Sequence, residues 1–132
     1  MASGSYDLVT GPLAGSPASA YDLDGGTTSV RSPLINLPVG KTITLTLKYY
    51  FAHYSNSSNL DYFRVQIVGA TTTTSIFTEL GAKDNDNAVW ATLTYNLSSF
   101  AGQSVYILIT AADASNDSLV EAAVDDVVII AQ

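Results

Sequence analysis

Apolar and polar residues alternate strictly through several short segments of this chain. In KTITLTLKYY (residues 41–50), Ile43, Leu45 and Leu47 alternate with threonines. Successive side chains of a β-strand point to opposite faces, so a repeat of two residues predicts a strand with one buried face. DYFRVQIVG (residues 61–69) repeats the pattern, with phenylalanine, valine and isoleucine on its apolar side. A chain of this kind is expected to form sheets.

Five other segments are rich in β-branched and aromatic residues, and three of them (71–80, 89–97 and 104–112) are bounded by the turn residues Gly, Asn, Asp or Ser. YDLVTGPL (residues 6–13) is a further candidate strand. Short strands at regular spacing are typical of sandwiches and barrels. We therefore predict an all-β, antiparallel, two-sheet, jelly-roll-like β-sandwich of about seven to nine strands. The five segments are TTSVRSPLINL (27–37), TTTTSIFTEL (71–80), VWATLTYNL (89–97), SVYILITAA (104–112) and AAVDDVVII (122–130).

Length and composition define the class of protein. With 132 residues, 47% hydrophobic and 13% charged, the chain is expected to fold as one domain with a substantial core. Its net charge of −7 argues against nucleic acid and anionic membranes as partners, because both require basic patches. No apolar stretch is long enough to insert into a membrane as a helix. We expect the isolated domain to be a monomer.

The ends and the cysteine content add little. The opening MASGS (residues 1–5) is typical of a remnant of an expression tag, so we expect a single β-sandwich module over residues 6–132. Cysteine is absent, so disulfides and thiolate metal sites are excluded.

Two groups of acidic residues suggest a cation. In DLDGG (residues 22–26), Asp22 and Asp24 precede two glycines, whose conformational freedom lets a turn aim several oxygens at one point. Calcium takes six to eight oxygen ligands, including main-chain carbonyls. The spacing is not that of an EF-hand loop, and an ordinary acidic turn is the alternative.

The second group lies in the last apolar segment, where Asp125 and Asp126 are adjacent. Neighbouring strand residues point to opposite faces, so one of the two carboxylates is expected to face the core. A buried carboxylate requires a cation or several hydrogen-bond donors. Arg31 or Arg64 could replace a metal in this role, and the sequence does not decide which aspartate faces inward.

Four longer segments of the sequence, given at the end of this paragraph, resemble a known family of domains. They resemble the accessory β-sandwich that follows the catalytic domain in secreted bacterial zinc carboxypeptidases and related extracellular proteases, over roughly residues 24–130. More distantly, the chain is similar to MAM and cleaved-adhesin domains, which are jelly rolls, several with structural calcium. It lacks the cysteines of MAM domains, so their role in receptor adhesion is not carried over. The four segments are DGGTTSVRSP, YYFAHYSNSSNLDYFRV, LGAKDNDNAVWATLTYNLSSFAGQSVYILITAAD and SLVEAAVDDVVI.

The resemblance implies an extracellular, non-catalytic module with structural calcium. We expect at least one ion to bridge the DLDGG loop to the closing strand. By similarity, the best-placed ligands are Asp24 and the Asp125/Asp126 pair; the further candidates are Asp22, Asp61 and Glu121.

The residues themselves give little support to catalysis. The chain has one histidine, His53, no cysteine and no Gly-x-Ser-x-Gly motif, so a hydrolytic triad or a zinc site of the usual kind is not expected. Paired carboxylates for glycoside hydrolysis stay open on composition alone. We predict that the protein is not an enzyme.

The segment YYFAHYSNSSNLDY (residues 49–62) suggests a ligand surface. Planar aromatic rings stack on sugars while Asn, Asp and Arg side chains bond hydroxyls. Tyr50, Phe51 and His53 are more readily explained as packing residues, as is Trp90 beyond this segment. The predicted ligand-binding residues are Tyr54, Asn56, Asn59, Tyr62 and Arg64.

Together these features predict a calcium-stabilised accessory module of a secreted bacterial enzyme that binds polysaccharide or a cell-surface glycan. The alternative is a structural or adhesion module that packs on its own catalytic domain or on other surface proteins, without binding glycan.

Overall fold

The computed structural model describes residues 1–11, 22–114 and 116–132. In these ranges it contains nine strands and one turn of 3-10 helix, η1 (Ser98–Phe100). No helix in the described ranges is long and apolar enough to cross a membrane. The strands are β1 (Leu8–Val9), β2 (Gly26–Arg31), β3 (Ile35–Asn36), β4 (Ile43–His53), β5 (Tyr62–Val68), β6 (Thr73–Leu80), β7 (Ala91–Asn96), β8 (Ser104–Asp113) and β9 (Val120–Ala131).

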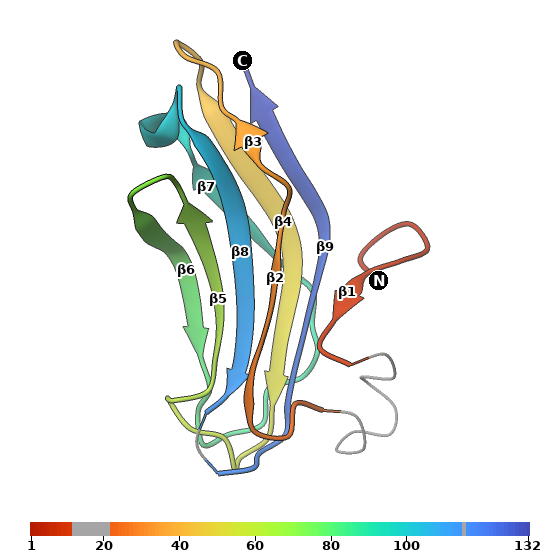
Figure 1. The fold of residues 1–132 in the computed structure, drawn as a ribbon. Coiled ribbons are helices and arrows are strands. Elements are labelled where there is room, and N and C mark those ends of the chain that lie inside the picture. Colours follow the sequence, from red (N-terminus) through yellow and green to blue (C-terminus); the bar gives the residue numbers. More distant parts are fainter. Residues whose placement is uncertain (12–21, 115) are drawn as a thin grey trace.

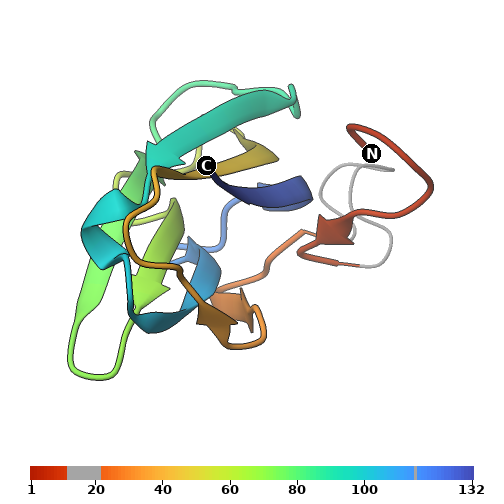
Figure 2. The ribbon, with the colours of Figure 1, turned by 90° about the horizontal axis from the view of Figure 1, so that it is seen from above.

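The strands form two antiparallel sheets that lie face to face (Figures 1 and 2). Sheet A has the order β1-β9-β4-β7. Sheet B has the order β2-β8-β5-β6, and β3 also pairs with β8. From β3 onward the chain changes sheet at β4, β5, β7, β8 and β9. The predicted all-β, two-sheet sandwich is confirmed.

The predicted strands lie where the alternation placed them, with two differences. The segment 27–37 is divided into β2 and β3, with Pro33 between them, because proline has no N–H to donate to a ladder. The candidate strand at 6–13 is only two residues long in its described part, Leu8–Val9, and residues 12 and 13 lie outside the described ranges.

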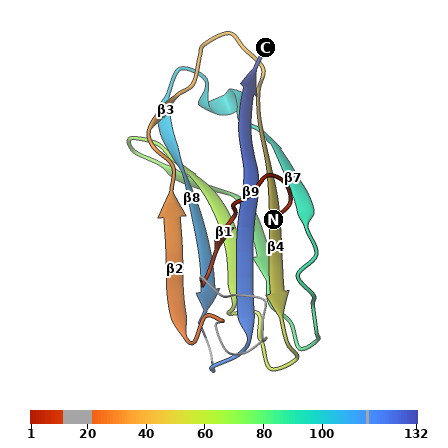
Figure 3. The same ribbon diagram turned by 90° about the vertical axis from the view of Figure 1, so that its right-hand side faces the viewer.

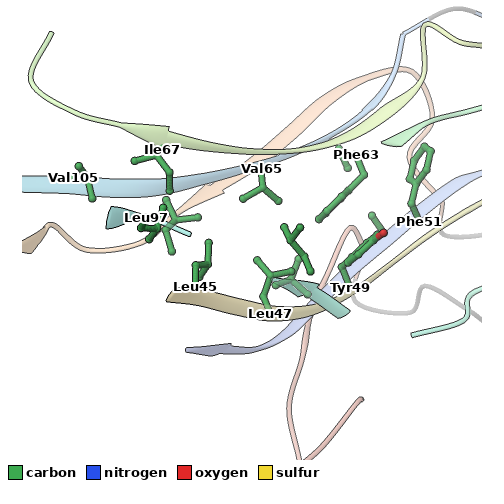
Figure 4. Close-up of a cluster of buried hydrophobic side chains, with 14 of the residues drawn as sticks. Leu45, Leu47, Tyr49, Phe51, Phe63, Val65, Ile67, Leu97 and Val105 are labelled. Atoms are coloured by element: carbon green, nitrogen blue, oxygen red, sulfur yellow. The ribbon is translucent and has the colours of Figure 1, made fainter. Parts of the chain in front are cut away.

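The core fills the space between the sheets. Alternate residues of β4 and β5, such as Leu45 and Val65, are 0% exposed. The ring of Tyr49 stacks on Phe63 across the two layers, with centroids 5.1 Å apart. Each large apolar side chain removed from water stabilises the fold by roughly 1.5–3 kcal/mol. Figure 4 shows Leu45, Leu47, Tyr49, Phe51, Phe63, Val65, Ile67, Leu97 and Val105 in this cluster.

A β-bulge interrupts β9 beside its two aspartates. Thr46 of β4 lies opposite Val128 and Lys48 lies opposite Asp125, so β9 has one extra residue between these pairs. Asp126 has a φ of 51°, a left-handed conformation that aspartate adopts more readily than most residues. The extra residue breaks the alternation. Both aspartates are half-buried and neither belongs to the core, so the prediction that one faces inward is wrong.

Candidate functional site

The two predicted halves of the calcium site lie apart. Leu23 donates its N–H to Val120 at the start of β9, which places the DLDGG loop at that end of the strand. Asp125 lies five residues further on, about 16 Å away along the strand. Its Oδ2 accepts hydrogen bonds from the N–H groups of Ala2 at 2.9 Å and Ser3 at 3.0 Å. Among the described residues, Asp24 is thus not grouped with Asp125 and Asp126 to hold a metal, and a calcium bridge between them stays a prediction.

Three main-chain N–H groups bond Asp125, and two of them, those of Ala2 and Ser3, belong to the MASGS segment. The N–H groups of Ser3, Asp126 and Ala2 hold the pKa of Asp125 below the usual range, because they bond the charged form.

Asp61 is also held by hydrogen bonds. It is 0% exposed, and its oxygens accept from Ser57 Oγ at 2.8 Å and from the N–H groups of Ser58 at 2.6 Å and Ala114 at 2.8 Å. Burial favours the neutral form, but these donors outweigh it and lower the pKa of Asp61. The carboxylate ties the loop between β4 and β5 to the end of β8, and this explains its burial without a metal.

Asp113 has the same role, and the sequence analysis missed it. Its side chain is 1% exposed and accepts from Gly25 N at 3.0 Å, Ser118 N at 3.1 Å and Ser118 Oγ at 3.0 Å. Asp113 thus fastens the DLDGG loop to the turn between β8 and β9. The available signal was its position at the end of a buried strand and before a Ser- and Asn-rich turn.

Asp22 is the acidic residue that is left unsatisfied. Its Oδ1 is buried and has no hydrogen-bond partner among the described residues. Burial raises the pKa of Asp22, and the nearby charges of Asp24 and Asp113 add to this effect, against a bond from its own N–H. Asp24 itself is exposed. In the described ranges no three acidic or histidine side chains are grouped to hold a metal. Asp22 is therefore the predicted metal ligand whose buried oxygen has no partner among the described residues.

Glu121, another predicted ligand, is buried on the outer side of sheet A. It lies opposite Ala52 of β4 and is 3% exposed. Burial, followed by the charges of Glu121 and Asp7, raises the pKa of Tyr50. Tyr50 also contacts Trp90 edge to face, with ring centroids 5.1 Å apart. Both rings therefore pack within the protein, as the sequence analysis expected.

The predicted ligand-binding residues fall into two groups. Tyr54, Asn56 and Asn59 are exposed in the loop between β4 and β5, and Tyr54 is 44% exposed. Asn56 Nδ2 donates to the carbonyl oxygen of Asp117 at 3.5 Å, the limit of a hydrogen bond. Tyr62 and Arg64 lie instead on β5, where they point away from the core.

Tyr62 and Arg64 belong to a larger surface, which we name the outer face of sheet B. It consists of the side chains of β2, β5, β6 and β8 that alternate with the core residues. Residues directly opposite each other on neighbouring strands share a face, so the register defines four rows. From β6 towards β2 the rows are Leu80–Tyr62–Ala112–Thr27, Thr78–Arg64–Thr110–Ser29, Ser75–Gln66–Leu108–Arg31 and Thr73–Val68–Tyr106.

Two arginines on this face lie over tyrosine rings. The guanidinium carbon of Arg64 is 4.1 Å from the centroid of Tyr62, and that of Arg31 is 5.4 Å from the centroid of Tyr106. Arg64 Nε also donates to Thr78 Oγ1 at 3.3 Å. Such contacts hold the side chains flat against the sheet. The face therefore carries rings, guanidinium groups, amides and hydroxyls.

Tyr62 and Arg64 were predicted as ligand-binding residues, whereas Arg31, Gln66 and Tyr106 were not. Alternation assigns each of these to the polar side of its own strand. It does not say which strands are neighbours or in what register. That information came only with the pairing of β2 and β5 on either side of β8.

A groove opens at one side of the sandwich, between β2 of sheet B and β9 of sheet A. Figure 3 shows the course of these two strands and of β1 from this side. One cavity there has a volume of about 300 Å³, and its apolar lining includes Val9, Val30, Ile109 and Val124. A second cavity of about 480 Å³ continues it towards Asp125 and Arg31. β1 pairs with only Ala123 and Val124 of β9, so β1 covers little of this side.

Comparison with known proteins adds a likeness in fold. No protein-family model matches the chain, and no curated protein matches its sequence. A solved structure of a carbohydrate-binding module, described as "CBM4 structure and function", is similar over 84% of this chain and 78% of that chain, at 14% sequence identity and a TM-score of 0.43. The link to zinc carboxypeptidases stays a prediction. The proposals below stand on the geometry of this chain.

Proposed function

We propose that this chain is a non-catalytic accessory module of a secreted bacterial enzyme, and that it binds polysaccharide or cell-surface glycan through the outer face of sheet B. The observation that carries the proposal is the four-row surface in which Tyr62 and Tyr106 alternate with Arg64, Gln66 and other hydrogen-bonding side chains. Aromatic faces pack on the C–H faces of sugar rings, and amides and guanidinium groups bond hydroxyls.

The shape of this surface suits a polymer. An extended chain can lie across several strands and make a small contact with each row. Gln66 Nε2 already bonds Ser75 Oγ at 3.0 Å, so the polar groups are oriented before a ligand arrives. Preorganised side chains lose less conformational entropy on binding.

The position of His53 supports a non-catalytic role. It is the single histidine of the sequence and is 3% exposed. Its ring packs against Phe51, with centroids 5.6 Å apart. An imidazole in this position is remote from a polymer on the protein surface.

The proposal is tested by binding to insoluble cellulose, xylan, chitin and bacterial cell wall, and by affinity electrophoresis in gels that contain soluble polysaccharide. At least one polymer should retain the wild type, and Tyr62→Ala and Tyr106→Ala should each weaken retention by about five-fold or more, the effect of losing roughly 1 kcal/mol of ring contact. Tyr6→Ala is the matched control, because Tyr6 is 89% exposed and lies outside sheet B. Equal retention of all variants would contradict the assignment of the face.

The groove between β2 and β9 favours the second function, a module that packs on its own catalytic domain or on another surface protein. Its rim carries partly exposed apolar residues, with Leu8 53%, Val30 37% and Val127 46% exposed. A Leu8→Gln variant separates the two functions, because it changes no charge and Leu8 lies on β1 of sheet A. It should leave polysaccharide binding intact if the outer face of sheet B is the site, and should disrupt docking if the module serves as an interface.

We also propose that calcium binds at Asp22 and Asp24, without a bridge to Asp125 and Asp126. The buried, unpartnered Oδ1 of Asp22 supports it. A bound cation would offset the repulsion between these carboxylates and would fix the DLDGG loop.

A further inference from the structure

We infer that the polysaccharide recognised by the outer face of sheet B is acidic: a linear chain whose sugars carry carboxylates. This inference rests on the function proposed above and adds the class of polysaccharide. It is carried by the charge, the availability and the spacing of Arg31 and Arg64.

The outer face of sheet B is positive on a protein whose net charge is −7. Arg31 and Arg64 are the charged residues in its four rows, all of which lie in described strands. Glu79 of β6 is opposite Phe63 and faces the interior, where the hydroxyl of Tyr49 bonds it. Asp113 at the end of β8 is buried. Asp7, Asp125 and Asp126 line the cavity beside Arg31, at the edge of this face. Within the four rows themselves the charge is positive, which favours an anionic ligand there although the net charge of the protein is negative.

Both guanidinium groups keep donors for a ligand. Among the described residues, neither forms an ion pair with an acidic side chain. Arg31 contacts the ring of Tyr106, and Arg64 contacts Tyr62 and uses Nε for Thr78. A guanidinium has five N–H donors and binds a carboxylate through two parallel hydrogen bonds. A neutral sugar has no group that matches this fork as well.

The spacing of the two arginines suits a polymer rather than a small acid. Arg31 lies opposite Leu108, and Arg64 lies opposite Thr110 on the other side of β8. Two strand spacings across and two residues along separate their α-carbons by about 12 Å. A chain that bonds both arginines must therefore present two carboxylates on different sugars. The sugars between them would lie over Leu108, Thr110 and Gln66.

The test compares polygalacturonate with the same polymer after reduction of its carboxyl groups, by isothermal titration calorimetry. Polygalacturonate should bind the wild type, and carboxyl reduction should weaken binding by about ten-fold or more, as should Arg31→Gln or Arg64→Gln. Lys48→Gln is the matched control and should bind like the wild type. Lys48 is a basic residue on the outer side of sheet A, where its Nζ bonds Thr92. Dextran sulfate should bind more weakly than polygalacturonate. Circular dichroism checks that each variant is folded.

Each other result overturns the inference in a recognisable way. In one such result, carboxyl-reduced polygalacturonate binds as tightly as polygalacturonate, both arginine variants bind normally and Tyr62→Ala binds weakly. This would show that the ligand is neutral and would leave the proposed function standing. A loss in Lys48→Gln equal to that in the arginine variants, or tighter binding of dextran sulfate, would show unspecific attraction of polyanions. If no polysaccharide of any class binds, the inference and the proposed function fail together.

Discussion

At the scale of single residues, the buried acids differ in what satisfies them. Asp61 and Asp113 each accept three hydrogen bonds from neighbouring N–H and hydroxyl groups. Asp22 has a buried oxygen with no partner in the described residues. The sequence shows that acidic residues lie beside apolar strands, but it does not show which of them accept hydrogen bonds. That depends on loops which meet only in the folded chain.

Replacing Asp61 tests the first arrangement. Asp61→Asn should destabilise the fold by about 2–3 kcal/mol at pH 7, because hydrogen bonds to a charged group are lost and one donor then faces an amide. The folded pKa of Asp61 is lowered, so its contribution is complete above the unfolded value near 3.9 and is lost as pH falls through the folded value. Urea unfolding from pH 7 to pH 2 measures both effects.

The difference between wild type and Asp61→Asn should therefore narrow below about pH 4. Asp84→Asn serves as the control, because Asp84 is exposed in the connection between β6 and β7, and it should change stability little. A difference that stays constant with pH would show that the charge of Asp61 is not what stabilises the loop.

At the scale of elements, regular strands were predictable from the sequence and the β-bulge was not. Strands β4 and β5 are predictable from the alternation of apolar and polar residues. Buried and partly exposed residues alternate through β5 and through the first half of β4. The bulge in β9 does not, because one extra residue depends on the partner strand. The DLDGG loop is fastened at the start of β9, whereas the two aspartates lie at the bulge in the middle of the strand, and the sequence alone does not show this separation.

The DLDGG loop carries its own prediction. Without metal, Asp22→Asn should be at least as stable as wild type at pH 7, because a carboxyl with a raised folded pKa stabilises only at low pH and loses this contribution as pH rises. With calcium at one hundred times its Kd, the wild type should gain about 2.7 kcal/mol and Asp22→Asn should not. Thermal melting in EGTA and in millimolar calcium measures the gain.

Asp84→Asn should respond to calcium as the wild type does. If calcium leaves the wild-type melting temperature unchanged, the calcium proposal is lost. If Asp22→Asn gains as much as the wild type, the ion binds elsewhere.

At the scale of the whole molecule, the fold was predictable and the binding face only partly so. Alternation, turn residues and composition were sufficient for a two-layer sandwich. Tyr62 and Arg64 were identified because they stand near an aromatic segment. Arg31 on β2 and Tyr106 on β8 are distant in sequence from Tyr62 and Arg64 on β5. They share a face with them because β8 lies between β2 and β5 in the sheet. Long-range register of this kind has no signature in one sequence.

The central claim is that polysaccharide lies across the outer face of sheet B. It is tested most directly by titrating the 15N-labelled module separately with an oligogalacturonate and a xylo-oligosaccharide, and mapping the backbone shifts by NMR. The account predicts that one ligand shifts amides of β2, β5 and β8 around Arg31, Arg64 and Tyr106, and leaves sheet A unchanged. Shifts confined to the loop at Tyr54 or to the groove between β2 and β9 would contradict it.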